Sequence, residues 1–323
     1  MLGVVFSRTL LHRLPIVLAT VGCLTLPVGS AFSGPRTPEQ RSAPRTTAAA
    51  DEFKALRQKA EQGDAWAQFH LGDAYNLGQG VPEDPVQAAT WYRKAAEQGN
   101  AMAQYTLGMM YSSGRGVPRD EGQAMAWYRK AAEQGQVSPQ MILGEAYYRG
   151  LRGVPQDSAE AAAWFRKAAE QGNSRARFIL GGMYLEGSGV PQDEGQAAAW
   201  FRKAAEQGAV NAQVMLGVMY STGRGVPRDA GKAATWYLKA AEQGDAEAQF
   251  NLAVFYRLGQ GVPLDLIEAF KWSTVAAGRL SGDQEKANAA FLEATARMLT
   301  AERLAEAQKR ASEWTAAFEK RKK

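Results

Sequence analysis

The sequence is poor in the residues that build disulfides, zinc sites and histidine-based catalytic centres. Its 323 residues include one cysteine and two histidines, which excludes a disulfide framework, a Cys/His zinc cluster and most histidine-based catalysis. The net charge of +5 is too small to indicate a nucleic-acid-binding surface. Hydrophobic residues make up 46% of the chain, as in a folded rather than a disordered protein. The 33 glycines and 8 tryptophans, by contrast, are numerous enough to need an explanation.

The first thirty residues are typical of an export signal. Basic residues at 8, 12 and 13 precede an apolar stretch over 14–26, and a small-x-small cleavage site ends at Ala31. We therefore expect residues 1–31 to be a signal peptide and the protein to be periplasmic or secreted. Cleavage would remove one of the two histidines and the single cysteine, and it would leave no integral membrane span. The Pro-, Ser-, Thr- and Arg-rich residues 32–50 are predicted to form a flexible linker.

Three other interpretations of the N-terminus stay open. Cys23 could be the acylated residue of a lipoprotein, although Thr20 is a poor residue three positions before it. An uncleaved anchor would be short and would contain Pro15 and Pro27. A mitochondrial transit peptide would also be arginine-rich and poor in acids, but it should be amphipathic rather than continuously apolar.

A unit of about 36 residues occurs six times between residues 61 and 277. The phrase Ala-Glu-Gln-Gly recurs at intervals of 36 or 37 residues, ending at Gly63, Gly99, Gly135, Gly172, Gly208 and Gly244. A Val-Pro pair follows each time, and nine residues after its proline comes a tryptophan, at Trp91, Trp127, Trp164, Trp200, Trp236 and Trp272. The one extra residue lies in the third loop, at 150–153. Such a period indicates a helical repeat array.

Each unit is predicted to contain two helices, here called helix A and helix B. In the first copy, helix A runs from Asp64, an N-cap, to Leu77. Helix B begins at Asp84, with Gln87 as the second member of a capping box. Glycine recurs in the middle of helix A in five copies, which indicates close approach of another helix, at Gly72, Gly108, Gly144, Gly181 and Gly217. The tryptophans lie on the core face of helix B, so packing is favoured over stacking on a ligand.

These units resemble the Sel-1-like repeat family, a relative of tetratricopeptide repeats. Residues 96–132 reproduce nearly all of the family unit, from Ala-Glu-x-Gly through Leu-Gly and Gly-x-Gly-Val to Trp-Tyr-Arg-Lys-Ala-Ala. The resemblance implies an all-α, right-handed α/α solenoid with a concave face lined by helix A. Residues 51–60 are expected to form an N-terminal capping helix. Residues 278–323 are expected to form C-terminal capping helices, with a Thr300 cap before the second, and a basic tail.

The positions of helix A that differ between copies share a second face of the helix, and they are the candidate partner-binding site. In the first copy they are Trp66, His70, Asp73 and Leu77. Several are large and apolar, as suits peptide binding, although the same residues could simply pack against the neighbouring repeat. The predicted partner-binding residues are Trp66, His70, Met102, Met109, Ile142, Arg175, Ile179, Met215 and Val218.

The sequence favours a non-catalytic adaptor of the cell envelope that binds a peptide or a partner protein. It contains no P-loop, no His-Glu-x-x-His, no Gly-x-Ser-x-Gly and no Ser-x-x-Lys motif. We expect a monomer with no cofactor, no metal and no nucleic-acid partner. The alternative, implied by a cysteine-rich branch of the family, is β-lactam binding or hydrolysis. The repeats of that branch carry paired cysteines, which this array lacks.

Overall fold

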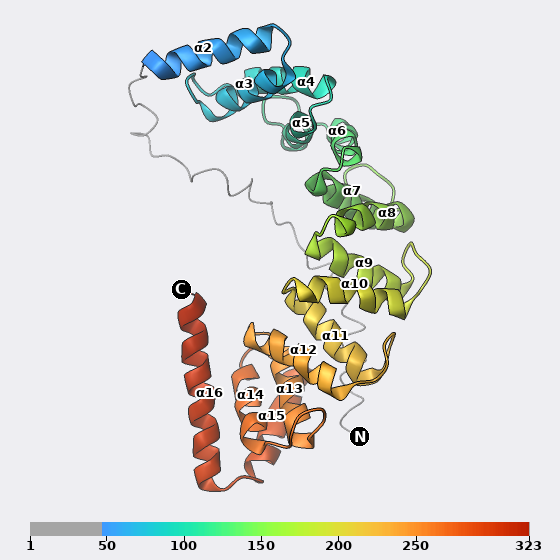
Figure 1. Cartoon of the computed structure of the whole chain (residues 1–323), viewed down its shortest axis with the longest axis vertical. Coiled ribbons are helices and arrows are strands. Elements are labelled where there is room, and N and C mark those ends of the chain that lie inside the picture. The colour runs from blue at the N-terminus through green and yellow to red at the C-terminus, as the bar shows by residue number, and fades with distance from the viewer. Residues whose placement is uncertain (1–46, 323) are drawn as a thin grey trace. The chain divides into compact units, whose positions relative to one another are not determined.

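The structure of the protein is a computed structural model that describes residues 47–322, and every regular element in this range is an α-helix (Figure 1). The predicted all-α solenoid is confirmed. The predicted signal peptide, Cys23 and nearly all of the predicted linker lie outside the described residues. None of the helices in residues 47–322 combines the length and the apolar character needed to cross a bilayer.

The described chain forms two compact units, residues 47–171 and residues 172–322. The helices of the first unit are α2 (Thr47–Glu61), α3 (Ala65–Leu77), α4 (Pro85–Glu97), α5 (Ala101–Ser113), α6 (Glu121–Glu133), α7 (Val137–Arg149) and α8 (Ser158–Glu170). The helices of the second unit are α9 (Ser174–Glu186), α10 (Glu194–Glu206), α11 (Val210–Thr222), α12 (Ala230–Glu242), α13 (Ala246–Leu258), α14 (Leu266–Ala276), α15 (Asp283–Ala296) and α16 (Ala301–Lys322).

Helices A and B alternate within each unit, and each packs on the next. In the first unit α3, α5 and α7 are helices A, and α4, α6 and α8 are helices B. The preceding α2 packs on α3 as a helix B would, and it begins at Thr47 rather than at Asp51. In the second unit α9, α11 and α13 are helices A, and α15 and α16 pack on the last helix B, α14.

The predicted N-caps form. Of the predicted capping box, the bond to the Asp84 side chain forms, whereas the return bond from the Asp84 amide to the Gln87 side chain does not. The Asp64 carboxylate accepts a hydrogen bond from the Ala67 amide at 2.7 Å. At the start of α4, Asp84 accepts from the Val86 and Gln87 amides, as an N-cap should. The Asp84 amide, however, donates to the Tyr75 carbonyl at the end of helix A, at 2.9 Å, and not to the Gln87 side chain. Because the Asp84 amide already donates to helix A, the Gln87 side chain has no capping role.

The glycine in the middle of helix A lies directly against an aromatic ring of helix B. A Cβ atom placed on Gly72 would lie 2.7 Å from the Tyr92 ring, and one placed on Gly108 would lie 2.7 Å from the Tyr128 ring. Gly144, Gly181 and Gly217 face Phe165, Phe201 and Tyr237 in the same way. Real Cβ atoms do not approach other atoms so closely, so these positions require glycine. The predicted packing role of the glycines is confirmed.

Five of the six fixed tryptophans are buried in the core and Trp236 is half-buried, and all six are covered by lysines of the same helix. Trp91 is 9% exposed, and the Lys94 ammonium lies 4.0 Å from the centre of its ring. The same pairing occurs for Trp127 with Lys130, also at 4.0 Å, and in later copies. Each pair is a cation–π contact. The indoles therefore serve packing, as predicted.

Glutamine side chains join successive repeats within each unit, a role that the sequence pattern did not predict. The buried Gln104 amide of α5 donates to the Ala96 carbonyl at the end of α4, at 3.0 Å. Gln134 then donates to the Gln104 oxygen at 2.7 Å. Equivalent bonds are made by Gln68 and Gln98, by Gln140 and Gln171, and by Gln213 and Gln243. Pairs of glutamines 30 or 31 residues apart are the sequence signal for this contact.

The last repeat is closed by the C-terminal helices. In α14, Ser273 donates to the buried Asn288 of α15 at 2.5 Å, and the Asn288 amide donates back to the Ser273 carbonyl. Arg310 of α16 pairs with Glu268 of α14 at 3.2 Å. The Thr300 hydroxyl accepts from the Arg303 amide at 3.3 Å, as expected of a residue that precedes the second of these helices.

We expect Gly108→Ala to destabilise the protein, although alanine is by itself the better helix former by about 1 kcal/mol. The added Cβ would overlap the Tyr128 ring, and overpacking of this kind costs about 1–3 kcal/mol. Thermal unfolding followed by circular dichroism measures the change. Gly122→Ala is the matched control, because a Cβ at this exposed glycine would approach only Asp120, at 3.3 Å. Equal melting temperatures for the two variants would contradict the packing role.

Gln104→Met should lower the midpoint of urea unfolding, because it removes both glutamine bonds while nearly preserving side-chain volume. A hydrogen bond of this kind contributes about 1 kcal/mol, and a buried group left without a partner costs more. Gln123→Met is the control, because Gln123 is exposed and receives its cap through its backbone amide. If both variants unfold at the wild-type midpoint, the glutamines do not hold the repeats together.

Candidate functional site

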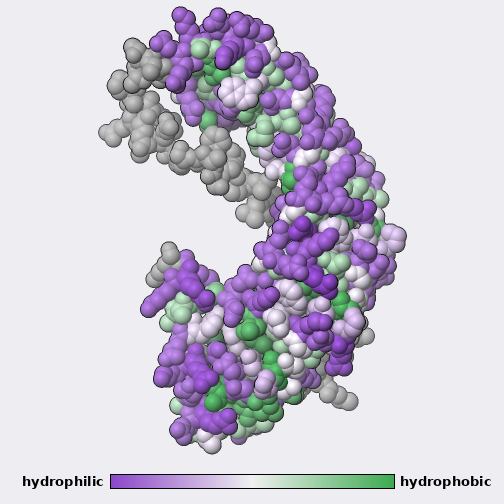
Figure 2. Space-filling model, in the orientation of Figure 1, coloured by the Kyte–Doolittle hydropathy of each residue, from purple (hydrophilic) through white to green (hydrophobic). Residues whose placement is uncertain are grey.

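The variable positions of helix A form one face of α3, and this face contains exposed apolar side chains. Trp66, His70, Asp73 and Leu77 are spaced so that all four lie on the same side of the helix. Trp66 is 63% exposed and Leu77 is 38% exposed. Figure 2 shows mostly hydrophilic residues on the visible surface, with apolar residues in small clusters among them. A tryptophan exposed to this degree is unusual for a side chain that has only a structural role.

An aromatic and acidic row runs along this face of α3. The rings of Trp66 and His70 lie 4.0 Å apart between centres, at an angle of 56°. The Nδ1 atom of His70 is 3.4 Å from Oδ2 of Asp73. From the adjacent α4, the buried Tyr92 hydroxyl donates to Oδ1 of Asp73 at 2.7 Å. The carboxylate is thus held in place by α4 as well as by its own helix.

Burial raises the pKa values of Asp73 and Tyr92. Loss of solvation raises the pKa of Asp73, and the hydrogen bonds from Tyr92 and His70 only partly offset that effect. Burial, together with the neighbouring Asp73 carboxylate, also raises the pKa of Tyr92 above its usual range, so the phenol remains a donor. Asp73 is therefore a carboxylate whose charge is not fully compensated by its neighbours. Its side chain is still 25% exposed.

The next two helices A continue the face with less exposed residues. Met102 of α5 occupies the position of Trp66 and is 48% exposed. Met109 of α5 and Ile142 of α7 are half-buried and pack against a core cluster that includes Tyr128 and Leu143. These two residues therefore belong partly to the core, as the alternative interpretation of the face proposed.

In the second unit the apolar residues at the equivalent positions of helix A are buried. Ile179 and Met215 are each 4% exposed and Val218 is 8% exposed, whereas Arg175 is half-buried. These three apolar side chains offer little surface to a partner in this structure. Of the nine predicted partner-binding residues, Trp66 and Met102 are the most accessible apolar ones, and His70 lies beside Trp66.

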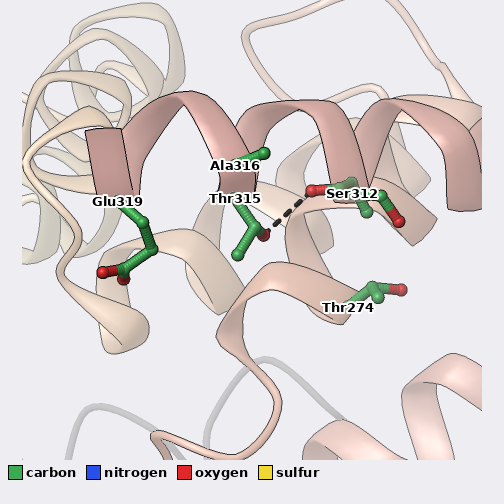
Figure 3. A pocket seen from close by; sticks show the side chains of 6 residues that line it. Thr274, Ser312, Thr315, Ala316 and Glu319 are labelled. Atoms are coloured by element: carbon green, nitrogen blue, oxygen red, sulfur yellow. Dashed lines mark hydrogen bonds between the residues drawn. The ribbon is translucent and has the colours of Figure 1, made fainter. Parts of the chain in front are cut away.

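A shallow pocket lies between α14 and α16. Its volume is about 390 Å³, and Thr274, Ser312, Thr315 and Glu319 line it (Figure 3). Two of its hydroxyls bond to their own helix, Ser312 to the Gln308 carbonyl and Thr315 to the Ala311 carbonyl. Glu319 is the only titratable side chain among these lining residues. Within residues 47–322 no three His, Cys, Asp or Glu side chains gather as metal ligands would.

The predicted site did not include Asp73 of α3 or Tyr92 of α4, which donates to it. Asp73 is on the predicted variable face but is not one of the predicted partner-binding residues, and Tyr92 belongs to helix B. A histidine and an aspartate three residues apart on one helix are a local signal for the first contact. The bond from Tyr92 joins two helices, so the spacing of α3 residues does not predict it.

Comparison with known structures supports the fold. A protective antigen present in uropathogenic Escherichia coli strains and displaying an SLR fold is 35% identical, with a TM-score of 0.59; the match covers 84% of this chain and 57% of that chain. A Sel1 repeat protein from Oxalobacter formigenes is 34% identical, with a TM-score of 0.52, over 72% of this chain and 93% of that one. The chain thus spans little more than half the length of the Escherichia coli antigen. The comparison with curated proteins gave no match.

The family comparison agrees with the six units observed in the structure. The model of the family described as Sel1 repeat matches residues 67–100, 101–136, 140–173, 174–208, 210–245 and 246–278. Each matched segment contains one helix A and one helix B. The matched segments together cover well over half of the sequence, and the chain belongs to the Sel1 repeat family.

Proposed function

We propose that the protein is a non-catalytic adaptor of the cell envelope that binds a peptide segment or a partner protein on the helix A face of residues 65–149. The observation that carries this proposal is the exposure of Trp66 and Met102, at equivalent positions of successive helices A. Both α3 and α5 pack on α4, so the two side chains are presented by one rigid support. Large apolar side chains on a rigid surface are typical anchors of protein interfaces.

The family supports the general part of this proposal. Proteins built from Sel1 repeats are generally scaffolds for protein interactions and typically not enzymes. In this chain the glycine, tryptophan and glutamine positions serve packing within and between repeats. The residues that differ between copies are left to determine which partner is bound. Nothing in residues 47–322 gives comparable support to a hydrolytic function, and in the α14–α16 pocket the Ser312 and Thr315 hydroxyls bond to their own helix.

The envelope location rests on the sequence of the N-terminus. A basic start, an apolar stretch over 14–26 and a cleavage site ending at Ala31 together support export through a signal peptide. We accordingly propose a periplasmic or secreted protein, with cleavage after Ala31. Acylation at Cys23 is the competing possibility.

The helix A face can be tested by removing its two exposed anchors. Phage-displayed random peptides are selected on the protein without residues 1–31, and the affinities of the selected peptides are then measured by fluorescence anisotropy. Trp66→Ala combined with Met102→Ala should weaken binding by at least about tenfold, because burial of one large apolar side chain contributes roughly 1.5–3 kcal/mol. Val86→Ala is the matched control, since Val86 is 62% exposed on helix B. Unchanged binding by the double variant would refute the proposed surface.

Export can be tested on the full chain produced in a Gram-negative host. The protein recovered from the periplasm or the medium should begin at residue 32, as measured by mass spectrometry of its N-terminal peptide. Ala31→Arg should block this processing, because the site requires a small residue. A chain that begins at Cys23 and carries radiolabel from palmitate would instead establish a lipoprotein. An unprocessed chain in the cytoplasm would contradict both forms of export.

A further inference from the structure

The Trp66 indole differs from the tryptophans of helix B in what lies against it. Trp91 and Trp127 are at most 9% exposed, and each is covered by a lysine ammonium 4.0 Å from its ring centre. Trp66 is 63% exposed, and its ring neighbour is the imidazole of His70. The face of an indole attracts cations, so the protein already uses this chemistry elsewhere to cover its tryptophans. At Trp66 the indole is instead open to solvent.

The next member of this row is the carboxylate of Asp73, which lies beside His70 on the side away from the indole. In the described part of the chain, Asp73 accepts from the Tyr92 hydroxyl and lies beside His70, and no lysine or arginine forms an ion pair with it. Desolvation raises its pKa, which means that a nearby cation would stabilise its charged form. The exposed quarter of the side chain leaves room for that cation to approach from solvent.

We infer that Trp66, His70 and Asp73 form a subsite for a cationic side chain of the bound partner, with arginine fitting best. This inference rests on the proposed function. A planar guanidinium can stack on the indole while its N–H groups donate to Asp73, whereas an ammonium cannot do both equally well. Tyr92 keeps the carboxylate fixed, so little ordering is needed when the cation binds.

The neighbouring Met102 indicates how the rest of the partner segment is arranged. Met102 lies at the position equivalent to Trp66 on α5, and α3 and α5 both pack on α4. An aliphatic side chain of the same partner segment can cover Met102 while the arginine occupies the subsite. The partner is therefore a protein segment that carries both an arginine and an aliphatic residue.

The test uses the peptides selected on the protein without residues 1–31. We expect these peptides to be enriched in arginine and to carry an aliphatic residue as well. Replacing the arginine by citrulline, which keeps the shape but removes the charge, should weaken binding about fivefold, as expected for one cation–π contact and one partly exposed ion pair. Asp73→Asn should weaken binding by a smaller factor, and citrulline should cause a smaller loss in that variant than in the wild type, because only the contact with Trp66 remains to be lost.

Two controls keep the test decisive. Glu133→Gln removes an exposed carboxylate of helix B in the same unit and should bind as the wild type does. Asp73→Asn retains an oxygen that can accept from Tyr92, and its melting temperature shows whether it folds; the citrulline peptides test the same contact with the unaltered protein. Selected peptides without a basic residue, or equal affinities for arginine and citrulline peptides, would overturn the subsite. If those peptides still lost affinity with the Trp66 and Met102 double variant, the proposed function would stand while this inference failed.

Discussion

Contact between a glycine and an aromatic ring sets the distance between the two helices in each of the first five repeats. Because no Cβ intervenes, the Tyr92 ring lies against the backbone of helix A at Gly72, and later copies repeat the arrangement. The sixth copy shows that the two positions change together. There Ala253 stands at the glycine position and Ser273 at the aromatic position, and both are fully buried. A larger residue on helix A thus accompanies a smaller one on helix B, as conservation of core volume requires.

Contacts between repeats combine apolar packing with regular polar bonds, and they leave exposed positions of the helix A face free to vary. Glutamine amides bond to the end of the preceding helix B, and loop arginines pair with acids of the preceding repeat, as Arg115 does with Glu83 at 2.9 Å. The extra residue of the third loop is accommodated by a positive φ of 59° at Arg152, which still reaches Glu121 at 3.0 Å. These contacts do not use the positions of Trp66 and Met102. The packing of the repeats is therefore similar from copy to copy, whereas the exposed side chains of the helix A face differ.

Features that depend on neighbouring residues could be predicted from the sequence, and features that depend on distant ones could not. Helix ends, N-caps such as Asp64 and the close packing at Gly72 follow from local pattern and repetition. The bond from the Asp84 amide to the Tyr75 carbonyl joins the two ends of a loop, so the capping box expected from Gln87 was wrong. The sequence pattern also did not predict which side chains of the helix A face are exposed. Trp66 and Ile179 lie on equivalent faces, yet one is 63% exposed and the other 4%.

The amide-to-carbonyl bond at the start of helix B also affects how such an array can change in length. The same bond occurs in each copy, from Asp84 to Tyr75, from Asp120 to Tyr111 and onward to the bond from Asp265 to Tyr256. Donor and acceptor always belong to the same 36-residue unit, so each hairpin satisfies these backbone groups without help from its neighbours. Gene duplication or unequal recombination that adds or removes one whole unit therefore leaves every remaining hairpin intact. Evolution can lengthen or shorten the protein in these steps while the individual helical hairpin stays the same.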